Sequence, residues 1–506
     1  MDIQNSQYNT LTKAGVVVGV SLVLGLLFDY FFYAKVPGIA FPLYIFLIVV
    51  GLFTIAHFLK KQMSKEVYWL LIPLMFFSAM VLVRSSYLLI FLNVVASLLL
   101  LLLIAEVSFG GKMKAFWMRD YIKIFFLPLS FIRPLLQTLS NLFSLPGVSK
   151  EQKVLSQVVR GVVMATPVLV VFVLLFSSAD LIFQKYVSDL ITINIKPETI
   201  LRSVLVLIAT LVYIGAYSYT FREEKGEQNA AQLTRAGRSV GHIESSILLG
   251  SVNVLFFIFI VVQLTYLFGG ESNISSQGFT YAEYARRGFF ELIAVAMISL
   301  LLLLTTEKYI AKKKDTGHTL GFKILSTALV IQVILTMASA FMRLSFYEEA
   351  YGFTTLRLYS HSFIILLAII FCLLLYKIYK DKRENTFAFH VFTAIALFLA
   401  AINFLNPDAF IARRNIERFV TTGKLDIYYL SRLSSDAIPD TIKVLNIPNE
   451  DLRKGFAREL YLRANNGDSH YFSKWQSLNI SRMTADKILN SKNPELEQYK
   501  DYQQPS

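Results

Sequence analysis

The long apolar runs of this sequence constrain its fold more than any other feature. A transmembrane helix needs about 20 consecutive, mostly apolar residues, and we count eleven runs of roughly that length. The predicted spans cover residues 14–33, 39–59, 67–83, 87–107, 157–177, 200–221, 246–268, 289–306, 322–342, 359–379 and 386–405. We therefore predict an all-α fold, a polytopic helical bundle with about eleven transmembrane helices.

The composition supports a membrane class and argues against other classes. Hydrophobic residues make up 55% of the chain and charged residues only 17%, whereas soluble proteins carry about 25% charge. The formal net charge of +14 fits a multi-pass protein, because Lys and Arg gather in cytoplasmic loops. We expect the lipid bilayer as a partner and no nucleic acid.

The distribution of Lys and Arg predicts an orientation. Counted in alternate loops, one set of segments holds 24 of these residues and the other set holds 8. The richer set, which includes the N-terminus, belongs in the cytoplasm. Because the predicted number of helices is odd, the C-terminal region is predicted to be extracytoplasmic.

Three changes in composition divide the chain into four predicted segments. Residues 1–110 form a four-helix membrane segment, 156–405 a seven-helix membrane segment, and 406–506 a small helical domain with no run long enough to cross. The middle of residues 111–155 is apolar but contains cations, Trp117 and two prolines, Pro128 and Pro134. This segment suits a helix in the cytoplasmic interface, or an elbow that only connects two spans.

Local signals predict helix ends in the C-terminal domain. Asn406 is a candidate N-cap followed by Pro407, and Gly423 is a candidate stop. The polar tail after Ser491 is expected to be loose.

Known catalytic and metal-binding motifs are absent from the sequence. The six His residues are scattered, and the single cysteine, Cys372, lies in an apolar run and is expected to be a buried filler. We therefore predict no metal and no cofactor. Asp29, at the end of the first span, is a weak candidate for the base of a membrane glycosyltransferase.

Three polar stretches stand out, over residues 281–291, 343–357 and 406–418, and the loop counts place all three outside the cell. In the first, Glu283, Arg287 and Glu291 follow one helical face. The candidate ligand-binding residues are Tyr281, Glu283, Tyr284, Arg286, Arg287, Glu291, Arg343, Tyr347, Glu348, Tyr351, Arg357, Asn406, Asp408 and Arg413.

Two interpretations of these stretches stay open. They could converge on a pocket for an anionic group, such as a lipid or sugar phosphate, whose oxygens Arg binds bidentately. Alternatively, the Arg and Glu side chains pair with one another and hold helix ends together.

The same stretches resemble a known bacterial family. The matching segments are TYAEYARRGFFEL (280–292), YEEAYGFTTLRL (347–358), NPDAFIARRNIER (406–418) and LDIYYLSRLSSDAIP (425–439). They resemble the multi-pass membrane proteins defined as domain of unknown function 4173, with a sister family, 4153. The resemblance covers the chain from about Gln263 onward and implies a bacterial plasma (inner) membrane protein. It supplies no activity and no catalytic residue.

Three functions fit these observations. The first is a non-enzymatic transporter, channel subunit or assembly protein with an outer-face site for an anionic or lipid-linked ligand. The second is a membrane enzyme that acts on a lipid-linked substrate at that face. The third is a signalling or scaffold protein whose C-terminal domain contacts a membrane protein partner.

Overall fold

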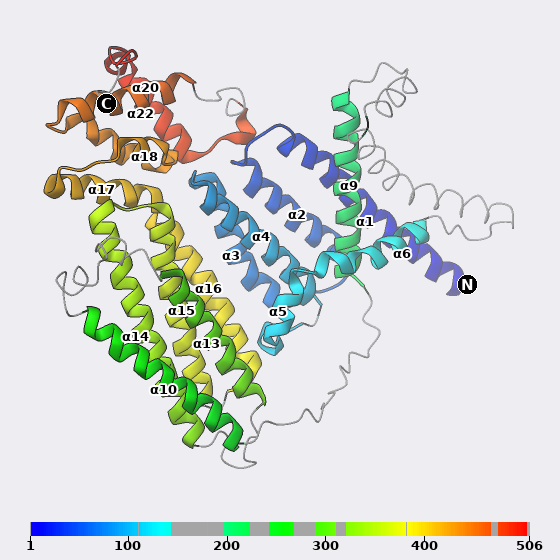
Figure 1. Ribbon diagram of the computed structural model, residues 1–506. Helices are drawn as coiled ribbons and strands as arrows, with labels where there is room; N and C mark the ends of the chain where they lie inside the picture. The colour runs from blue at the N-terminus through cyan, green and yellow to red at the C-terminus, as the bar shows by residue number, and fades with distance from the viewer. Residues whose placement is uncertain are drawn as a thin grey trace. The chain divides into compact units, whose positions relative to one another are not determined.

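The computed structural model describes residues 2–109, 111–142, 180, 197–222, 242–267, 289–309, 320–380, 382–466 and 474–502. Every regular element in these ranges is a helix (Figure 1). The chain forms two compact units, and each is described separately. The first unit comprises residues 1–113, 119–224 and 468–480, and the second comprises residues 114–118, 225–467 and 481–506.

The first unit is a bundle of long apolar helices. Its long helices are α1 (Asp2–Phe32), α2 (Ala40–Phe58), α3 (Lys65–Val83), α4 (Tyr87–Val107) and α9 (Pro197–Thr220). Helix α9 packs along α1, and Gly25 permits the close approach, since a Cβ there would lie 2.1 Å from Thr210 Oγ1. The short elements η1 (Met113–Ala115), α5 (Met118–Ile124), η2 (Leu127–Phe131) and α6 (Ile132–Leu142) follow α4, and residues 114–118 of this stretch are part of the second unit.

The second unit begins with a membrane bundle of five described helices. They are α10 (His242–Leu267), α13 (Phe289–Tyr309), α14 (Leu320–Tyr351), α15 (Thr355–Tyr379) and α16 (Glu384–Leu405), and they lie side by side in Figure 1. Their core is apolar and includes Leu303, Phe322, Val333 and Phe371, all of which are buried.

The C-terminal part of the second unit has a separate core. Its helices are α17 (Pro407–Thr422), α18 (Ile427–Arg432), η3 (Ser435–Ala437), α19 (Ile438–Thr441), η4 (Ile442–Asn446), α20 (Glu450–Asn466) and α22 (Ile480–Glu497). Ile411, Phe456 and Leu460 are fully buried in this core. Leu358, in the first turn of α15, belongs to the same core, so the helical domain is packed onto the end of a membrane helix.

A short segment near the C-terminus, Lys474–Ile480, belongs to the first unit although α20 and most of α22 belong to the second. We call it the strap, and it contains η5 (Trp475–Ser477). The Trp475 ring packs on Phe31, and Ile39 N–H donates to Leu478 O at 2.8 Å. Asn479 Nδ2 donates to Val81 O and Arg84 O, at 3.0 and 2.8 Å. The strap thus satisfies carbonyls at the C-terminal end of α3.

The observed helices confirm the predicted fold class. Within the described residues, nine helices are long and apolar enough to cross a membrane, or up to ten if α5 and η2–α6, bent by 69°, are one span. The nine coincide with predicted spans. Helix α13, which is not among the nine, covers the predicted span 289–306. The predicted span 157–177 lies outside the described residues, so the count of eleven stays a prediction.

Two local predictions are wrong, and a third, the helix start at Asn406 and Pro407, is confirmed in position but not in its capping contact. Asn406 occupies the N-cap position but makes no capping hydrogen bond. It joins α16 directly to α17 in the left-handed region (φ 53°), whereas a capping side chain requires an extended backbone. The described part of the tail after Ser491 is not loose, because α22 continues to Glu497 and Leu496 is buried. Cys372 is exposed on α15 rather than buried.

Candidate functional site

Five of the predicted ligand-binding residues cannot be placed. Tyr281, Glu283, Tyr284, Arg286 and Arg287 lie outside the described residues. Glu291 lies in the first turn of α13, where it is exposed.

The second and third polar stretches meet where α14 ends and α15 begins, and we call residues 343–361 the α14–α15 corner. Gly352 ends α14 with a φ of +85°, a conformation that glycine adopts without strain. Asn415 of α17 forms hydrogen bonds with both the backbone N–H and the backbone carbonyl of Phe353, the residue after Gly352. Its Oδ1 accepts from Phe353 N–H at 2.7 Å, and its Nδ2 donates to Phe353 O at 2.8 Å.

Two guanidinium groups bind the carbonyls at the C-terminal end of α14. Arg418 donates to Glu349 O and to Ala350 O, both at 2.6 Å. Arg357 donates to Gly352 O, and its guanidinium lies 4.2 Å from the ring centroid of Tyr347. These contacts satisfy carbonyls that a helix end leaves without intrahelical partners.

The two guanidinium groups at this corner form no ion pair with a described acidic group. Within the residues that the structure describes, neither Arg357 nor Arg418 has a carboxylate oxygen within 4.0 Å. Burial lowers the pKa of Arg418, and the positive charge of Arg357 lowers it further. The negative end of the α14 dipole and the positive end of the α15 dipole, each about half a charge, largely cancel. Neither guanidinium therefore has a carboxylate in contact, and Glu349, whose charge acts on Arg418 from a distance, offsets only part of the local positive charge.

A buried pair lies beside these cations. His361 Nδ1 is 3.3 Å from Glu348 Oε2, and both side chains are at least nine-tenths buried. The other ring nitrogen, Nε2, lies 3.1 Å from Phe341 O, and the His361 ring stacks on Phe341 with centroids 4.1 Å apart. Glu348 Oε1 has no hydrogen-bond partner among the described residues. The corner thus combines a buried carboxylate with two cations.

The remaining predicted residues divide between the corner and the C-terminal core. Arg343 is buried one turn before Tyr347, and the ring of Tyr351 packs 4.8 Å from that of Tyr347. By contrast, Arg413 is not part of the corner: its Nε lies 3.7 Å from Asp440 Oδ2, in the C-terminal part of the unit.

Asp408 and Asn406 also lie away from the corner cations. Asp408 Oδ2 accepts from Ser434 N–H at 3.1 Å, so Asp408, like Arg413, fastens α17 to the segments that follow it. Asn406 is only partly buried, at the junction of α16 and α17.

Sequence reasoning omitted Asn415, Arg418 and His361 from the candidate site, although the first two lie within the NPDAFIARRNIER segment. Their roles depend on contacts with backbone carbonyls and amides of a segment 62 to 69 residues away. No side-chain pattern signals such contacts. For His361 the signal was present, since it follows Arg357 by four residues on one helical face.

Other charged groups are paired within their own unit. Both oxygens of Asp29 accept from Arg202, the shortest contact being 2.6 Å. Asp29 is therefore engaged as an ion-pair partner, which is a poor state for a catalytic base. In the second unit, Lys377 Nζ donates to Glu307 Oε2 at 2.6 Å, and both side chains are 5% exposed.

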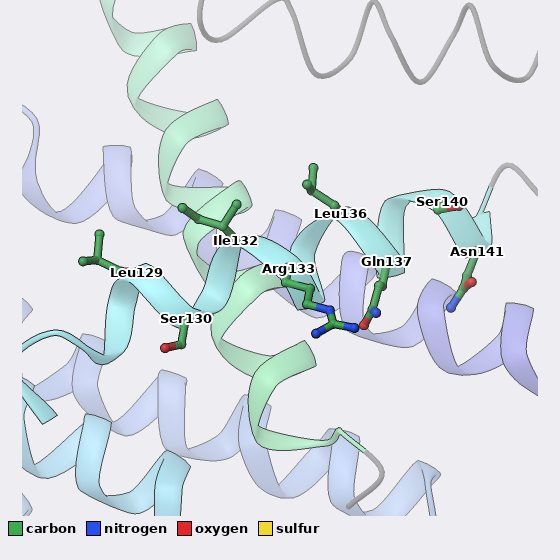
Figure 2. Close-up of a pocket in the computed structure, with 8 residues that line it drawn as sticks. All are labelled: Leu129, Ser130, Ile132, Arg133, Leu136, Gln137, Ser140 and Asn141. Atoms are coloured by element: carbon green, nitrogen blue, oxygen red, sulfur yellow. The ribbon is translucent and has the colours of Figure 1, made fainter. Parts of the chain in front are cut away.

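A shallow hollow of about 480 Å³ lies along α6 in the first unit. Its lining includes the polar Arg133 and Gln137 and the apolar Ile132 and Leu136 (Figure 2). An amphipathic helix of this kind suits a membrane interface, and it also suits an elbow, so both interpretations of residues 111–155 stay predictions. In the described part of the chain, no three His, Cys, Asp or Glu side chains are grouped to hold a metal ion.

The apolar helices and the absence of strands among the described residues define an integral, multi-pass α-helical membrane protein. The chain belongs to the family defined as domain of unknown function (DUF4153), whose model matches residues 71–444. The predicted resemblance to family 4173 is not confirmed, since the match is to its sister family. The match also begins well before Gln263. No curated protein and no solved structure matches the chain.

Proposed function

We propose that this protein is a non-enzymatic membrane protein, of the transporter, channel-subunit or assembly type, that binds an anionic or lipid-linked ligand. The binding site is the α14–α15 corner, on the outer face of a bacterial plasma membrane. The loop counts of Lys and Arg support this sidedness.

One observation carries the proposal: Arg357 and Arg418 share a helix end without a carboxylate partner among the described residues. Structural arginines in membrane proteins normally neutralise a carboxylate, because an uncompensated charge near hydrocarbon is costly. Here the nearest partners are carbonyl oxygens, which carry only partial charges. A phosphate group would supply the missing negative charge and accept hydrogen bonds from the remaining guanidinium N–H groups.

The buried Glu348 limits the kind of ligand that fits. A carboxylate beside the two cations would repel a second negative group, but it would accept hydrogen bonds from a hydroxyl or an amine. The corner therefore suits a ligand with one phosphate and a neighbouring hydrogen-bond donor, such as a sugar hydroxyl or an amino group. It suits a polyanion less well.

Native mass spectrometry tests this proposal. We would place the protein in nanodiscs of phosphatidylcholine and titrate it with hexadecyl phosphate and with inorganic phosphate. The double variant R357Q/R418Q should bind the probe at least about tenfold more weakly, because each charged hydrogen bond contributes roughly 1.5–3 kcal/mol.

The matched control is R414Q on the same helix as Arg418, since Arg414 is exposed and paired with Glu417. Its binding should equal that of the wild type. Equal binding by R357Q/R418Q, or no binding of either probe, would refute the site. Release of phosphate from the bound probe would indicate an enzyme instead.

A further inference from the structure

The second unit contains an apolar groove of about 730 Å³ between α14 and α15. Its lining includes Ala338 and Phe341 of α14 and Ile364, Ala368, Cys372 and Tyr376 of α15. The lining is almost wholly apolar. Ile365, Ile369 and Tyr376 are each at least 40% exposed, so the groove opens on the surface of the described helices of this unit.

Small side chains create this groove. Ala338 of α14 and Ala368 and Cys372 of α15 leave space that larger neighbours would fill. Ala368 and Cys372 are four residues apart and so lie one above the other on α15. The hollow therefore runs along the helices rather than across them.

One end of the groove adjoins the α14–α15 corner. Phe341 forms part of the groove wall, and the same ring stacks on His361, the partner of Glu348. A molecule in the groove would therefore have its polar end beside the corner and its apolar end among the side chains of α14 and α15.

The length of the groove selects the occupant. From Ile364 to Tyr376 it follows α15 for roughly 18 Å, at about 1.5 Å per residue. The hydrocarbon core of a bilayer is about 30 Å thick, so the groove is close to one leaflet in depth. This length and the apolar lining fit an extended hydrocarbon chain, and the cations at one end fit its anionic head group.

We infer that the groove between α14 and α15 binds the hydrocarbon chain of an anionic, phosphate-bearing lipid whose head group occupies the α14–α15 corner. This inference rests on the proposed function and deepens it, because it excludes a soluble anion as the ligand. The ligand is then a molecule with a phosphate head and one apolar chain lying along α15.

Photo-crosslinking tests the inference on the full-length protein in phosphatidylcholine nanodiscs. The probe is hexadecyl phosphate with a diazirine midway along its chain, and the crosslinked residues are mapped by mass spectrometry. We expect crosslinks on the lining residues of α14 and α15, and we expect unmodified hexadecyl phosphate, but not hexadecanol, to compete.

A matched pair of variants separates the groove from the rest of the bundle. A368L fills the groove and should lower the crosslinking yield at least about fivefold. A294L adds the same side chain at an exposed position of α13 and should leave the yield unchanged. A338L repeats the test from the α14 side in case A368L folds poorly.

Three results would overturn the inference. In the first, hexadecyl phosphate binds in an Arg-dependent way but crosslinks only outside the groove. This result would agree with the proposed function and show that the groove does not hold the hydrocarbon chain. Competition by hexadecanol as effective as that by hexadecyl phosphate would show that bulk hydrocarbon fills the groove. Absence of Arg-dependent binding would remove the proposed function and the inference together.

Discussion

Helix α15 carries a buried or half-buried cation near each end, and the two cations are treated differently. At its C-terminal end, Lys377 contacts Glu307 at 2.6 Å, and both side chains are 5% exposed. At its N-terminal end, Arg357 contacts a carbonyl and an aromatic ring, with a second guanidinium, Arg418, nearby. A cation is favoured at a helix C-terminus and disfavoured at an N-terminus.

The difference distinguishes a cation that stabilises the fold, Lys377, from a cation that we propose binds a ligand, Arg357. Lys377 has the partner and the helix end that stabilise it, so no ligand is needed to explain it. Arg357 has no carboxylate partner, it lies at the N-terminal end of its own helix, and it has another cation nearby. An unbalanced charge at a helix end is therefore better evidence for a ligand site than a buried ion pair is. The comparison can be tested with variants at both ends.

The largest effect on stability is expected at the C-terminal end of α15, where Lys377 is paired with Glu307. K377M removes the ammonium partner of the buried Glu307 carboxylate. Breaking one side of a buried ion pair typically costs about 3–5 kcal/mol, and thermal unfolding in detergent would measure the loss. The double variant E307L/K377M, which removes both charges, should regain most of the lost stability. If the double variant is as unstable as K377M, the pair is not the source of the effect.

A smaller change in stability is expected from ligand binding at the N-terminal end of α15, beside Arg357 and Arg418. Hexadecyl phosphate at a concentration about 100 times its Kd should stabilise the wild type by about 2.7 kcal/mol, since a ligand that binds only the folded state shifts the unfolding equilibrium. The shift should vanish in R357Q/R418Q and persist in E307L/K377M. A shift of equal size in all three proteins would show non-specific stabilisation by the lipid.

The turn that presents the corner should be sensitive to a single methyl group. Gly352 has a φ of +85°, and a Cβ there would lie 2.7 Å from Asn415 Oδ1. G352A should therefore destabilise the protein by about 1–2 kcal/mol and weaken binding of hexadecyl phosphate, because Asn415 must move. A glycine without such neighbours, Gly321, provides the control variant G321A. Equal effects of both variants would argue against a special role for the turn.

The smallest effect is expected for an exposed cation. Arg414 and Glu417 form a surface pair at 3.1 Å, with side chains 52% and 64% exposed. Exposed pairs of this kind contribute about 0–1 kcal/mol, so R414Q should shift the unfolding temperature very little. A loss comparable to that of K377M would mean that exposure does not distinguish the two cations.

The sequence predicted the helices far better than the contacts between them. Apolar runs of about 20 residues are sufficient to locate spans, and Gly423 correctly ended α17, where it has a φ of +67°. The partners of Arg418 could not be predicted, because they are backbone carbonyls exposed only where α14 stops. The exposure of Cys372 was also not predictable, since in a membrane bundle lipid-facing and core-facing positions are equally apolar.

The strap has a consequence for how the protein is made. Asn479 caps carbonyls of Val81 and Arg84, which lie 398 and 395 residues earlier in the chain. During synthesis the first four helices therefore emerge, and enter the membrane, long before the residue that seals their loop ends exists. Trp475, which covers Phe31, arrives equally late. Until residues 474–480 have been synthesised the first unit therefore lacks these contacts, and a chain that stops before residue 474 would never form them.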